Sequence, residues 1–215
     1  MLAIAHRSGN TVATLREALA AGVDLVETDV RLHHGRLEIR HQRRLGALPL
    51  HWDRHGIQPR WRWEPVELAA VLEALGEEHR LMLDLKGVHP RLAPRVAAQL
   101  RAVVPGRSLT VCTKQWWMLE SFDLPVRRVY SAATRTALSR LLAVAARGRR
   151  SIDGVSIRLS LLSPSVVDRL HESTDLVMTW SVDTEEALGR ARAVGADAVI
   201  SKDLSLLRKV MADRS

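Results

Sequence analysis

Short apolar runs alternate with helix-like patterns along the whole chain, and this alternation most limits the possible folds. Runs of four to seven mostly apolar residues predict strands, and longer segments with apolar residues three or four apart predict helices. The expected strands are Leu2–Ala5, Asp24–Val30, Arg80–Leu85, Ser108–Thr113, Arg127–Ser131, Gly154–Arg158, Leu176–Trp180 and Ala196–Ser201. The expected helices are Thr11–Ala21, Pro65–Leu75, Pro90–Val103, Trp116–Phe122, Thr134–Arg147, Pro164–Glu172, Thr184–Val194 and Leu204–Met211.

The alternation predicts an α/β protein with a parallel sheet and helical crossovers. An extra extended segment, Leu37–His41, follows a turn at Gly35. About eight strand–helix units in 215 residues indicate a compact (β/α)8 TIM barrel, with residues 1–215 as a single domain. A doubly wound open sheet is the alternative.

Composition limits the cellular setting and the partners. The formal net charge is +8, which favours anionic partners such as phosphate esters, nucleic acid or anionic membranes, although a solvated basic surface would give the same balance. No apolar run is long enough for a membrane span, and the apolar start Leu2–Ala5 is too short for a secretory signal. With Cys112 as the single cysteine, we expect a cytoplasmic protein without disulfides.

Acidic residues within two apolar strands predict a metal site. Glu27 and Asp29 are two residues apart, so both side chains lie on one face of their strand. Asp84 and Lys86 have the same spacing at the end of the next strand. Active sites of TIM barrels lie where the strands end, so Asp84 is a candidate third ligand. Carboxylate oxygens suit Mg2+ or Ca2+, with Mn2+ also accepted; a solvated strand edge and a structural salt bridge are the alternatives.

Motifs in one order along nearly the whole chain carry a family resemblance. These are Ile4-Ala5-His6-Arg7, Gly9-Asn10-Thr11, Glu27-Thr28-Asp29-Val30, His34-Gly35, Arg40-His41, Leu83-Asp84-Leu85-Lys86, Thr179-Trp180-Ser181-Val182-Asp183 and Gly195–Ser201. With them the chain resembles the glycerophosphodiester phosphodiesterase family. Its compact start and the Asp84-Leu85-Lys86 motif are similar to the related spider-venom-type phospholipase D branch.

The sequence departs from the family pattern at several positions. Ser8 stands where glycine is usual, Gly9 where glutamate is usual, and Gln42 where an aspartate follows the second histidine. The third carboxylate is aspartate, not glutamate. We expect Gln42 to lower the basicity of His41, unless another carboxylate replaces the missing one.

The resemblance implies hydrolysis of a glycerophosphodiester to glycerol 3-phosphate and an alcohol. Glu27, Asp29 and Asp84 would hold the divalent cation, Arg7 and Lys86 the phosphate, and His6 and His41 would form the acid–base pair. Trp180 would form a wall of the substrate pocket. Attack by water gives the monoester directly, whereas attack by the neighbouring glycerol hydroxyl gives a cyclic phosphate first.

Other residues and other functions stay open at this point. Asn10 is expected to cap the first helix, with contact to the phosphate as the alternative, and Lys114 and Lys202 would face the barrel mouth. The segment Gln42–Glu64 contains Trp52, Trp61 and Trp63, and would form a lid, a head-group pocket or a packed loop. An apolar lid would favour lysolipids, and a polar lid would favour deacylated glycerophosphodiesters. The alternatives are phospholipase D-type cleavage of lysophospholipids, a non-catalytic phosphate-binding barrel, and a nucleic-acid-binding protein, which we do not favour because no nucleic-acid-binding module is visible.

Overall fold

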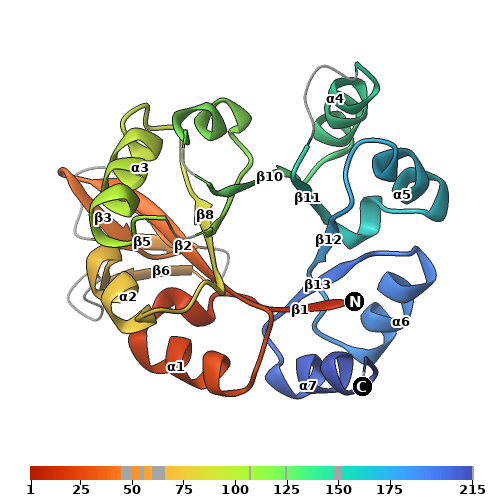
Figure 1. Ribbon diagram of the computed structural model, residues 1–215, viewed down its shortest axis with the longest axis horizontal. Helices are drawn as coiled ribbons and strands as arrows, with labels where there is room; N and C mark the ends of the chain where they lie inside the picture. Colours follow the sequence, from red (N-terminus) through yellow and green to blue (C-terminus); the bar gives the residue numbers. More distant parts are fainter. Residues whose placement is uncertain are drawn as a thin grey trace.

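The eight predicted strands form a closed barrel. The computed structural model describes residues 1–44, 50–53, 56–59, 66–106, 108–123, 125–147 and 152–214. The barrel strands are β1 (Leu2–Ala5), β2 (Leu25–His33), β8 (Leu81–Leu85), β9 (Thr110–Thr113), β10 (Arg127–Ala132), β11 (Gly154–Arg158), β12 (Val177–Trp180) and β13 (Ala198–Ser201). Figure 1 shows the strands at the centre with helices arranged around them.

Strand pairing distinguishes the barrel from the open sheet. Every neighbouring pair of these eight strands is parallel, and β1 pairs with β13 on one side and with β2 on the other. The first and last strands therefore meet and leave no free edge. The TIM-barrel prediction is confirmed, and the doubly wound alternative is excluded.

Helices follow the strands in the predicted order, with their ends set by capping residues. The α-helices are α1 (Val12–Ala20), α2 (Leu68–Leu75), α3 (Leu92–Val103), α4 (Arg135–Ala146), α5 (Pro164–His171), α6 (Glu185–Ala193) and α7 (Leu204–Ala212). The side chains of Thr11, Thr134, Ser163 and Thr184 accept hydrogen bonds from the first turns of α1, α4, α5 and α6. After β9 a 3-10 helix, Trp116–Ser121, takes the place of the expected short helix.

Short antiparallel strands extend the barrel beside β2. The turn at His34 and Gly35 joins β2 to β3 (Arg36–Ile39), which pairs with β7 (Val66–Glu67). Because Val66 and Glu67 pair in this sheet, α2 begins at Leu68, later than the predicted start at Pro65. The strands β4 (Arg43–Arg44), β5 (Leu50–Asp53) and β6 (Gly56–Pro59) form a separate small sheet.

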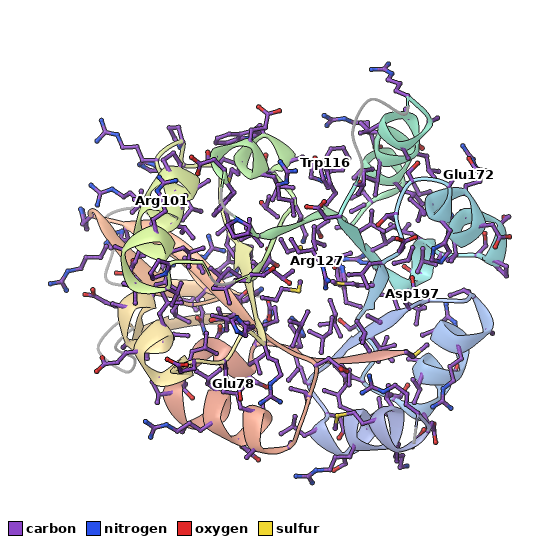
Figure 2. The ribbon with its side chains drawn as sticks, viewed as in Figure 1. Glu78, Arg101, Trp116, Arg127, Glu172 and Asp197 are labelled. Carbon is purple, nitrogen blue, oxygen red and sulfur yellow. The ribbon has the colours of Figure 1, made fainter. Side chains whose placement is uncertain are left out.

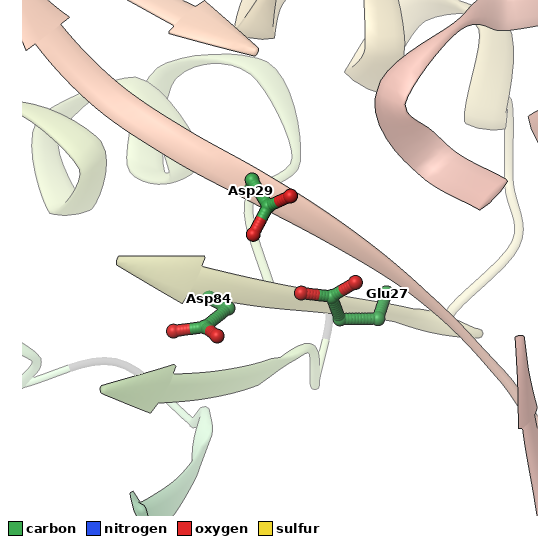
Figure 3. Close-up of side chains that lie close together, drawn as sticks. All are labelled: Glu27, Asp29 and Asp84. Atoms are coloured by element: carbon green, nitrogen blue, oxygen red, sulfur yellow. The ribbon is translucent and has the colours of Figure 1, made fainter. Parts of the chain in front are cut away.

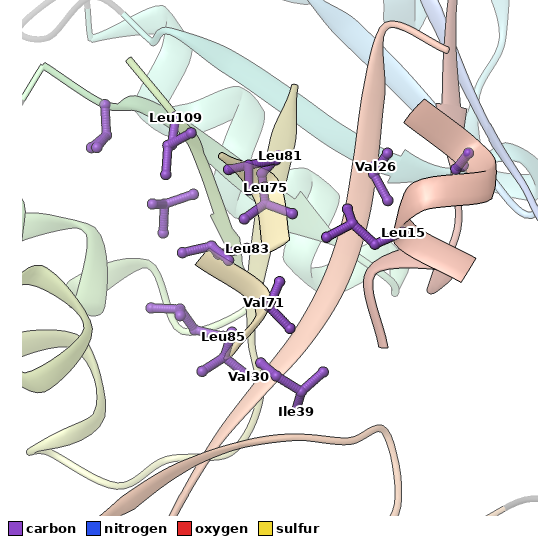
Figure 4. Packing of buried hydrophobic residues seen from close by; sticks show 14 of the residues in the cluster. Leu15, Val26, Val30, Ile39, Val71, Leu75, Leu81, Leu83, Leu85 and Leu109 are labelled. Carbon is purple, nitrogen blue, oxygen red and sulfur yellow. The ribbon is translucent and has the colours of Figure 1, made fainter. Parts of the chain in front are cut away.

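Apolar side chains fill two layers, one outside and one inside the barrel. Outside, Leu15 of α1 and Val71 and Leu75 of α2 pack on β2 and β8 (Figure 4). Inside, Ile4, Met82, Cys112 and six other buried residues form a second cluster. Figure 2 shows the side chains that fill the space between the strands and the helices. Within the described part of the chain, we find no helix with the length and apolarity needed to traverse a bilayer.

Candidate active site

A cavity opens at the carboxyl ends of the barrel strands. It has a volume of about 190 Å³ and collects residues from strands that are far apart in the sequence. Its lining includes seven residues predicted as site residues: His6, Arg7, Glu27, His41, Asp84, Lys86 and Trp180. The eighth, Asp29, is fully buried beside this cavity and contacts Arg7 and Lys86. The fold therefore brings all eight predicted site residues together.

Three carboxylates converge on one point beside the cavity. One oxygen from each of Glu27, Asp29 and Asp84 lies within 4.8 Å of the others. Figure 3 shows the three side chains close together on neighbouring strands. Asp29 and Asp84 are register partners on the paired strands β2 and β8, which explains why they meet. Burial raises the pKa values of Glu27 and Asp84, and the charge of Asp29 raises both further. The cluster thus concentrates negative charge that a cation would stabilise.

Two cations touch this cluster. The Lys86 ammonium contacts Asp84 and lies 2.9 Å from Asp29 Oδ1, and Arg7 Nε lies 3.5 Å from Asp29 Oδ2. Burial alone would raise the pKa of Asp29, but Lys86 and a hydrogen bond from Asn10 bring it below its usual range. Asp29 therefore stays ionised while its neighbours resist ionisation.

The turn after β1 is fitted closely against β2. Arg7 has a left-handed backbone (φ 59°), and its N–H donates to Glu27 Oε2 over 2.6 Å. The amide of Asn10 donates to Asp29 Oδ2 over 2.9 Å. Gly9 is buried, and a Cβ added there would lie 2.7 Å from Thr28 Cβ. This close approach gives a physical reason for glycine at position 9, where the family pattern has glutamate.

The two predicted acid–base residues line the same cavity as Glu27 and Asp84. His6 Nε2 is 4.0 Å from Glu27 Oε2. Among the described residues, Nδ1 of His6 and Nδ1 of His41 are buried and have no hydrogen-bond partner. Burial lowers the pKa of His6 to about 3, with a further contribution from Arg7. Burial also lowers the pKa of His41 to about 4, and Arg7 and Lys86 act in the same direction against the attraction of Asp29. Both rings are therefore neutral at pH 7.

Arginine side chains hold the backbone that carries His41. Arg31 donates to the carbonyl of His41 over 3.0 Å, and Arg40 donates to the carbonyl of Gln42. Arg40 itself is buried and pairs with buried Glu38 at 2.7 Å. No carboxylate of the described chain is paired with His41, although the charge of Asp29 acts on it. These contacts fix the backbone around His41. They do not supply a carboxylate in place of the aspartate that the family pattern has at position 42.

The structure also corrects and extends the sequence prediction. Asn10 does not cap α1, because Thr11 does, and its amide serves Asp29 instead. Lys114 lines the cavity as expected, whereas Lys202 lies in a separate surface depression near Ser8 and Asp183. Further lining residues were missed, namely Ser131, Ser156, Arg158, Met82, Ser181 and Ile200. Arg158 directly follows an apolar run, the same signal that identified Lys86.

A second cavity of about 360 Å³ adjoins the first. The two share His41, Asp84, Lys86 and Lys114 as lining residues. Trp52, from the predicted lid segment, lines the second cavity and is 44% exposed. Trp61 and Trp63 lie outside the described residues, so most of the lid prediction is not tested.

Comparison with known proteins finds solved structures of similar fold, but no match to a protein-family model or to a curated protein sequence. A Silicibacter pomeroyi structure, named as a candidate glycerophosphoryl diester phosphodiesterase, matches with a TM-score of 0.78 and 18% identity, over 100% of this chain and 94% of that chain. The Thermotoga maritima glycerophosphodiester phosphodiesterase matches with a TM-score of 0.74 and 16% identity, over 98% of each chain.

One of the similar structures holds a reaction product. An Oleispira antarctica phosphodiesterase in complex with the product sn-glycerol-3-phosphate matches with a TM-score of 0.73 and 19% identity, over 99% of this chain and 97% of that chain. At such identities the likeness shows a shared barrel fold. It agrees with the fold that the motif resemblance implies.

Proposed function

We propose that this chain, residues 1–215, is a metal-dependent phosphodiesterase that hydrolyses a glycerophosphodiester to glycerol 3-phosphate and an alcohol. The observation that carries the proposal is the convergence of three carboxylates, two neutral histidines and two paired cations at one barrel mouth. Phosphoryl transfer requires stabilisation of charge on phosphate oxygens and proton transfer to the leaving group. This set of side chains supplies both. The motif resemblance and the similar structures support the same reaction class.

Glu27, Asp29 and Asp84 fit a divalent cation. Their three oxygens lie within 4.8 Å of one another, and oxygen donors are the ligands that Mg2+, Ca2+ and Mn2+ accept. Burial, and after it the charge of Asp29, raises the pKa values of Glu27 and Asp84, and a bound cation would oppose both by favouring the ionised carboxylates. A bound divalent cation would polarise the phosphate and stabilise negative charge on its oxygens. Lys86, already between Asp29 and Asp84, would add a positive charge at the same place.

His6 and His41 would move the protons. A neutral imidazole can accept the proton of the attacking hydroxyl, and a protonated one can donate to the leaving alkoxide. In the described chain, Nδ1 of each ring has no protein hydrogen-bond partner that would compete for it. An anionic phosphate beside either ring raises its pKa and so favours the protonated form that the donor needs. In the water route the proton is taken from water, and in the cyclic-phosphate route from the glycerol hydroxyl. His6 and His41 would serve as proton acceptor and proton donor in both routes.

Two serine hydroxyls suit the glycerol part of such a substrate. Ser131 of β10 and Ser156 of β11 are register partners, and both line the cavity. Each is at most 4% exposed, so its hydroxyl is presented to the cavity and not to bulk solvent. Adjacent strands lie about 4.8 Å apart, so the hydroxyls form a pair that can bind a polyol. Trp180 bounds the same space.

A lysolipid substrate is a second candidate, favoured by the adjoining cavity. That cavity carries the exposed side chains of Trp52 and Val88, which are 44% and 69% exposed. Exposed apolar surface beside a catalytic cleft is a feature of sites that bind amphiphiles. Cleavage there would be of the phospholipase D type.

Hydrolysis followed by phosphorus NMR tests the proposal. We expect the native protein to convert glycerophosphoglycerol to glycerol 3-phosphate with Mg2+, Ca2+ or Mn2+, and EDTA to abolish the reaction. Glu27→Gln should remove activity, whereas Glu77→Gln, an exposed site far from the mouth, should not. Lysophosphatidylcholine in a parallel sample tests the second candidate. A folded protein without turnover on any diester would contradict the proposal and favour a binding barrel.

A further inference from the structure

Two cations in the cavity lining lie over an aromatic ring, and neither forms an ion pair with a carboxylate in the described chain. Lys114 follows β9, and its Nζ lies 5.1 Å from the centroid of the Trp180 ring. Arg158 ends β11 and is the register partner of Trp180, with its Cζ 5.3 Å from the same centroid. All three residues line the cavity that also holds the carboxylate cluster. The arrangement places two positive charges around one indole, at the mouth.

These charges differ from the other cations at the site. Lys86 and Arg7 each lie within 4.0 Å of a carboxylate of the cluster. In the described part of the chain, neither Lys114 nor Arg158 has a carboxylate within that distance. Both side chains are exposed, so their charges are accessible to a ligand that enters the cavity.

Charge balance also distinguishes Lys114 and Arg158 from Lys86 and Arg7. Three carboxylates, Lys86, Arg7 and one divalent cation together leave a single positive charge, which one phosphodiester monoanion neutralises. Lys114 and Arg158 then remain as two positive charges with no carboxylate within 4.0 Å in the described chain, although the charge of Asp84 also acts on Lys114. A ligand that fills the cavity and matches its charge needs a second negative group near Trp180.

We propose that Lys114, Arg158 and Trp180 form a subsite for a second anionic group of the substrate, a phosphate or a carboxylate several bonds from the scissile phosphate. Arginine binds such oxyanions through a planar fork, and lysine through a point charge. The inference rests on the proposed function and narrows it to anionic glycerophosphodiesters. A trimethylammonium group is disfavoured, because the ring that would receive it already carries two cations.

Substrates that differ in one group test the subsite. The probes are glycerophosphoglycerol, its terminal phosphate ester, glycerophosphoglycerate with a terminal carboxylate, and glycerophosphocholine. We expect kcat/KM to be about tenfold or more higher for the two anionic probes than for glycerophosphoglycerol, and lowest for glycerophosphocholine. The two anionic arms show whether the subsite prefers phosphate or carboxylate.

Variants locate the effect at the subsite. Lys114→Gln and Arg158→Gln should each reduce the ratio of kcat/KM between anionic and neutral probes by about tenfold. Lys209→Gln and Arg127→Gln remove a positive charge on α7 and at the amino end of β10 (Arg127 is labelled in Figure 2) and should leave the ratio as it is. An equal loss in all four variants would show a general charge effect and would overturn the subsite.

A binding measurement separates this inference from the proposed reaction. Titration calorimetry with EDTA present compares 1,3-propanediol bisphosphate with propyl phosphate. The bisphosphate should bind at least about tenfold more tightly, and Lys114→Gln should remove the difference. Equal binding of the two, or hydrolysis of glycerophosphoglycerol with no preference for anionic probes, would overturn the subsite while the hydrolase stands. Absence of hydrolysis on every probe would overturn the hydrolase alone.

Discussion

The two halves of the barrel mouth are built differently. On the half formed by β1, β2 and β8, charged side chains are paired, as buried Asp29 is with the half-buried Lys86 and Arg7. On the half formed by β9 to β12, the cations Lys114 and Arg158 lie over the Trp180 ring and have no carboxylate within 4.0 Å among the described residues, and serine hydroxyls are the neighbouring polar groups. Paired charges hold a fixed geometry, whereas unpaired charges are available to a ligand. We infer that the first half carries the chemistry and the second half recognises the substrate.

The largest expected effect comes from the histidines of the first half. His6→Ala or His41→Ala should lower kcat by about 10²- to 10⁴-fold, because general acid–base catalysis contributes that much. Hydrolysis of glycerophosphoglycerol, followed by phosphorus NMR, measures the loss. His79→Ala, an exposed site just before the amino end of β8, is the matched control. If both histidine variants kept the native kcat, the division between the halves would be wrong.

The buried pair behind His41 should matter for stability. Arg40→Met removes the buried guanidinium that pairs with Glu38 at 2.7 Å, and breaking a buried ion pair costs about 3–5 kcal/mol of unfolding free energy. Denaturant unfolding measures the change. The double variant Arg40→Met with Glu38→Leu should recover much of it, because both charges are gone. If the single variant were as stable as the native protein, the first half would not depend on this pair.

Gly9 tests how closely the first half is packed. A Cβ in Gly9→Ala would lie 2.7 Å from Thr28 Cβ, so the turn after β1 must move, at a cost of about 1–3 kcal/mol. Since that turn carries Arg7, activity should fall as well. Gly189→Ala is the control: it lies within α6, its Cβ meets nothing within 4 Å, and it should stabilise the protein by about 0.5–1 kcal/mol. Equal stability changes in the two variants would contradict the close packing.

The smallest effect is expected in the second half. Ser131→Ala and Ser156→Ala should each raise KM for glycerophosphoglycerol about three- to tenfold, the size of one lost hydrogen bond. For bis(4-nitrophenyl) phosphate, which has no glycerol, the change should be smaller than twofold. Steady-state kinetics with both substrates provides the comparison. Equal losses on the two substrates would show that the serines support the barrel and do not bind the polyol.

The sequence predicted the first half better than the second, and the reason is physical. Glu27, Asp29 and Asp84 stand out because carboxylates within apolar strands are costly unless a partner stabilises them. Ser131 and Ser156 give no such signal, since serine is common and only strand register brings the two together. Arg158 could have been found by the rule that identified Lys86, because both end an apolar run. The bounds of the barrel strands were predicted within a few residues.

The predicted positions of two polar side chains, Asn10 and Lys202, differ from those in the structure. Asn10 and Thr11 are both good capping residues, and the sequence could not show that Asp29 would take the amide of Asn10. Lys202 follows a strand end as Lys114 does, and its charge acts on His6, but it lines a separate depression near Ser8 and not the cavity. Such choices depend on packing around the strand end, which the local sequence does not specify.

Metal binding tests the central claim most directly. Mn2+ titration of the chelator-treated protein, followed by electron paramagnetic resonance, counts bound ions, and hydrolysis of glycerophosphoglycerol is measured on the same samples. The account predicts one tightly bound Mn2+ per chain, hydrolysis that rises with occupancy, and loss of both in Glu27→Gln and Asp84→Asn proteins that remain folded. Hydrolysis at full rate without bound metal, or unchanged Mn2+ binding in both variants, would contradict it.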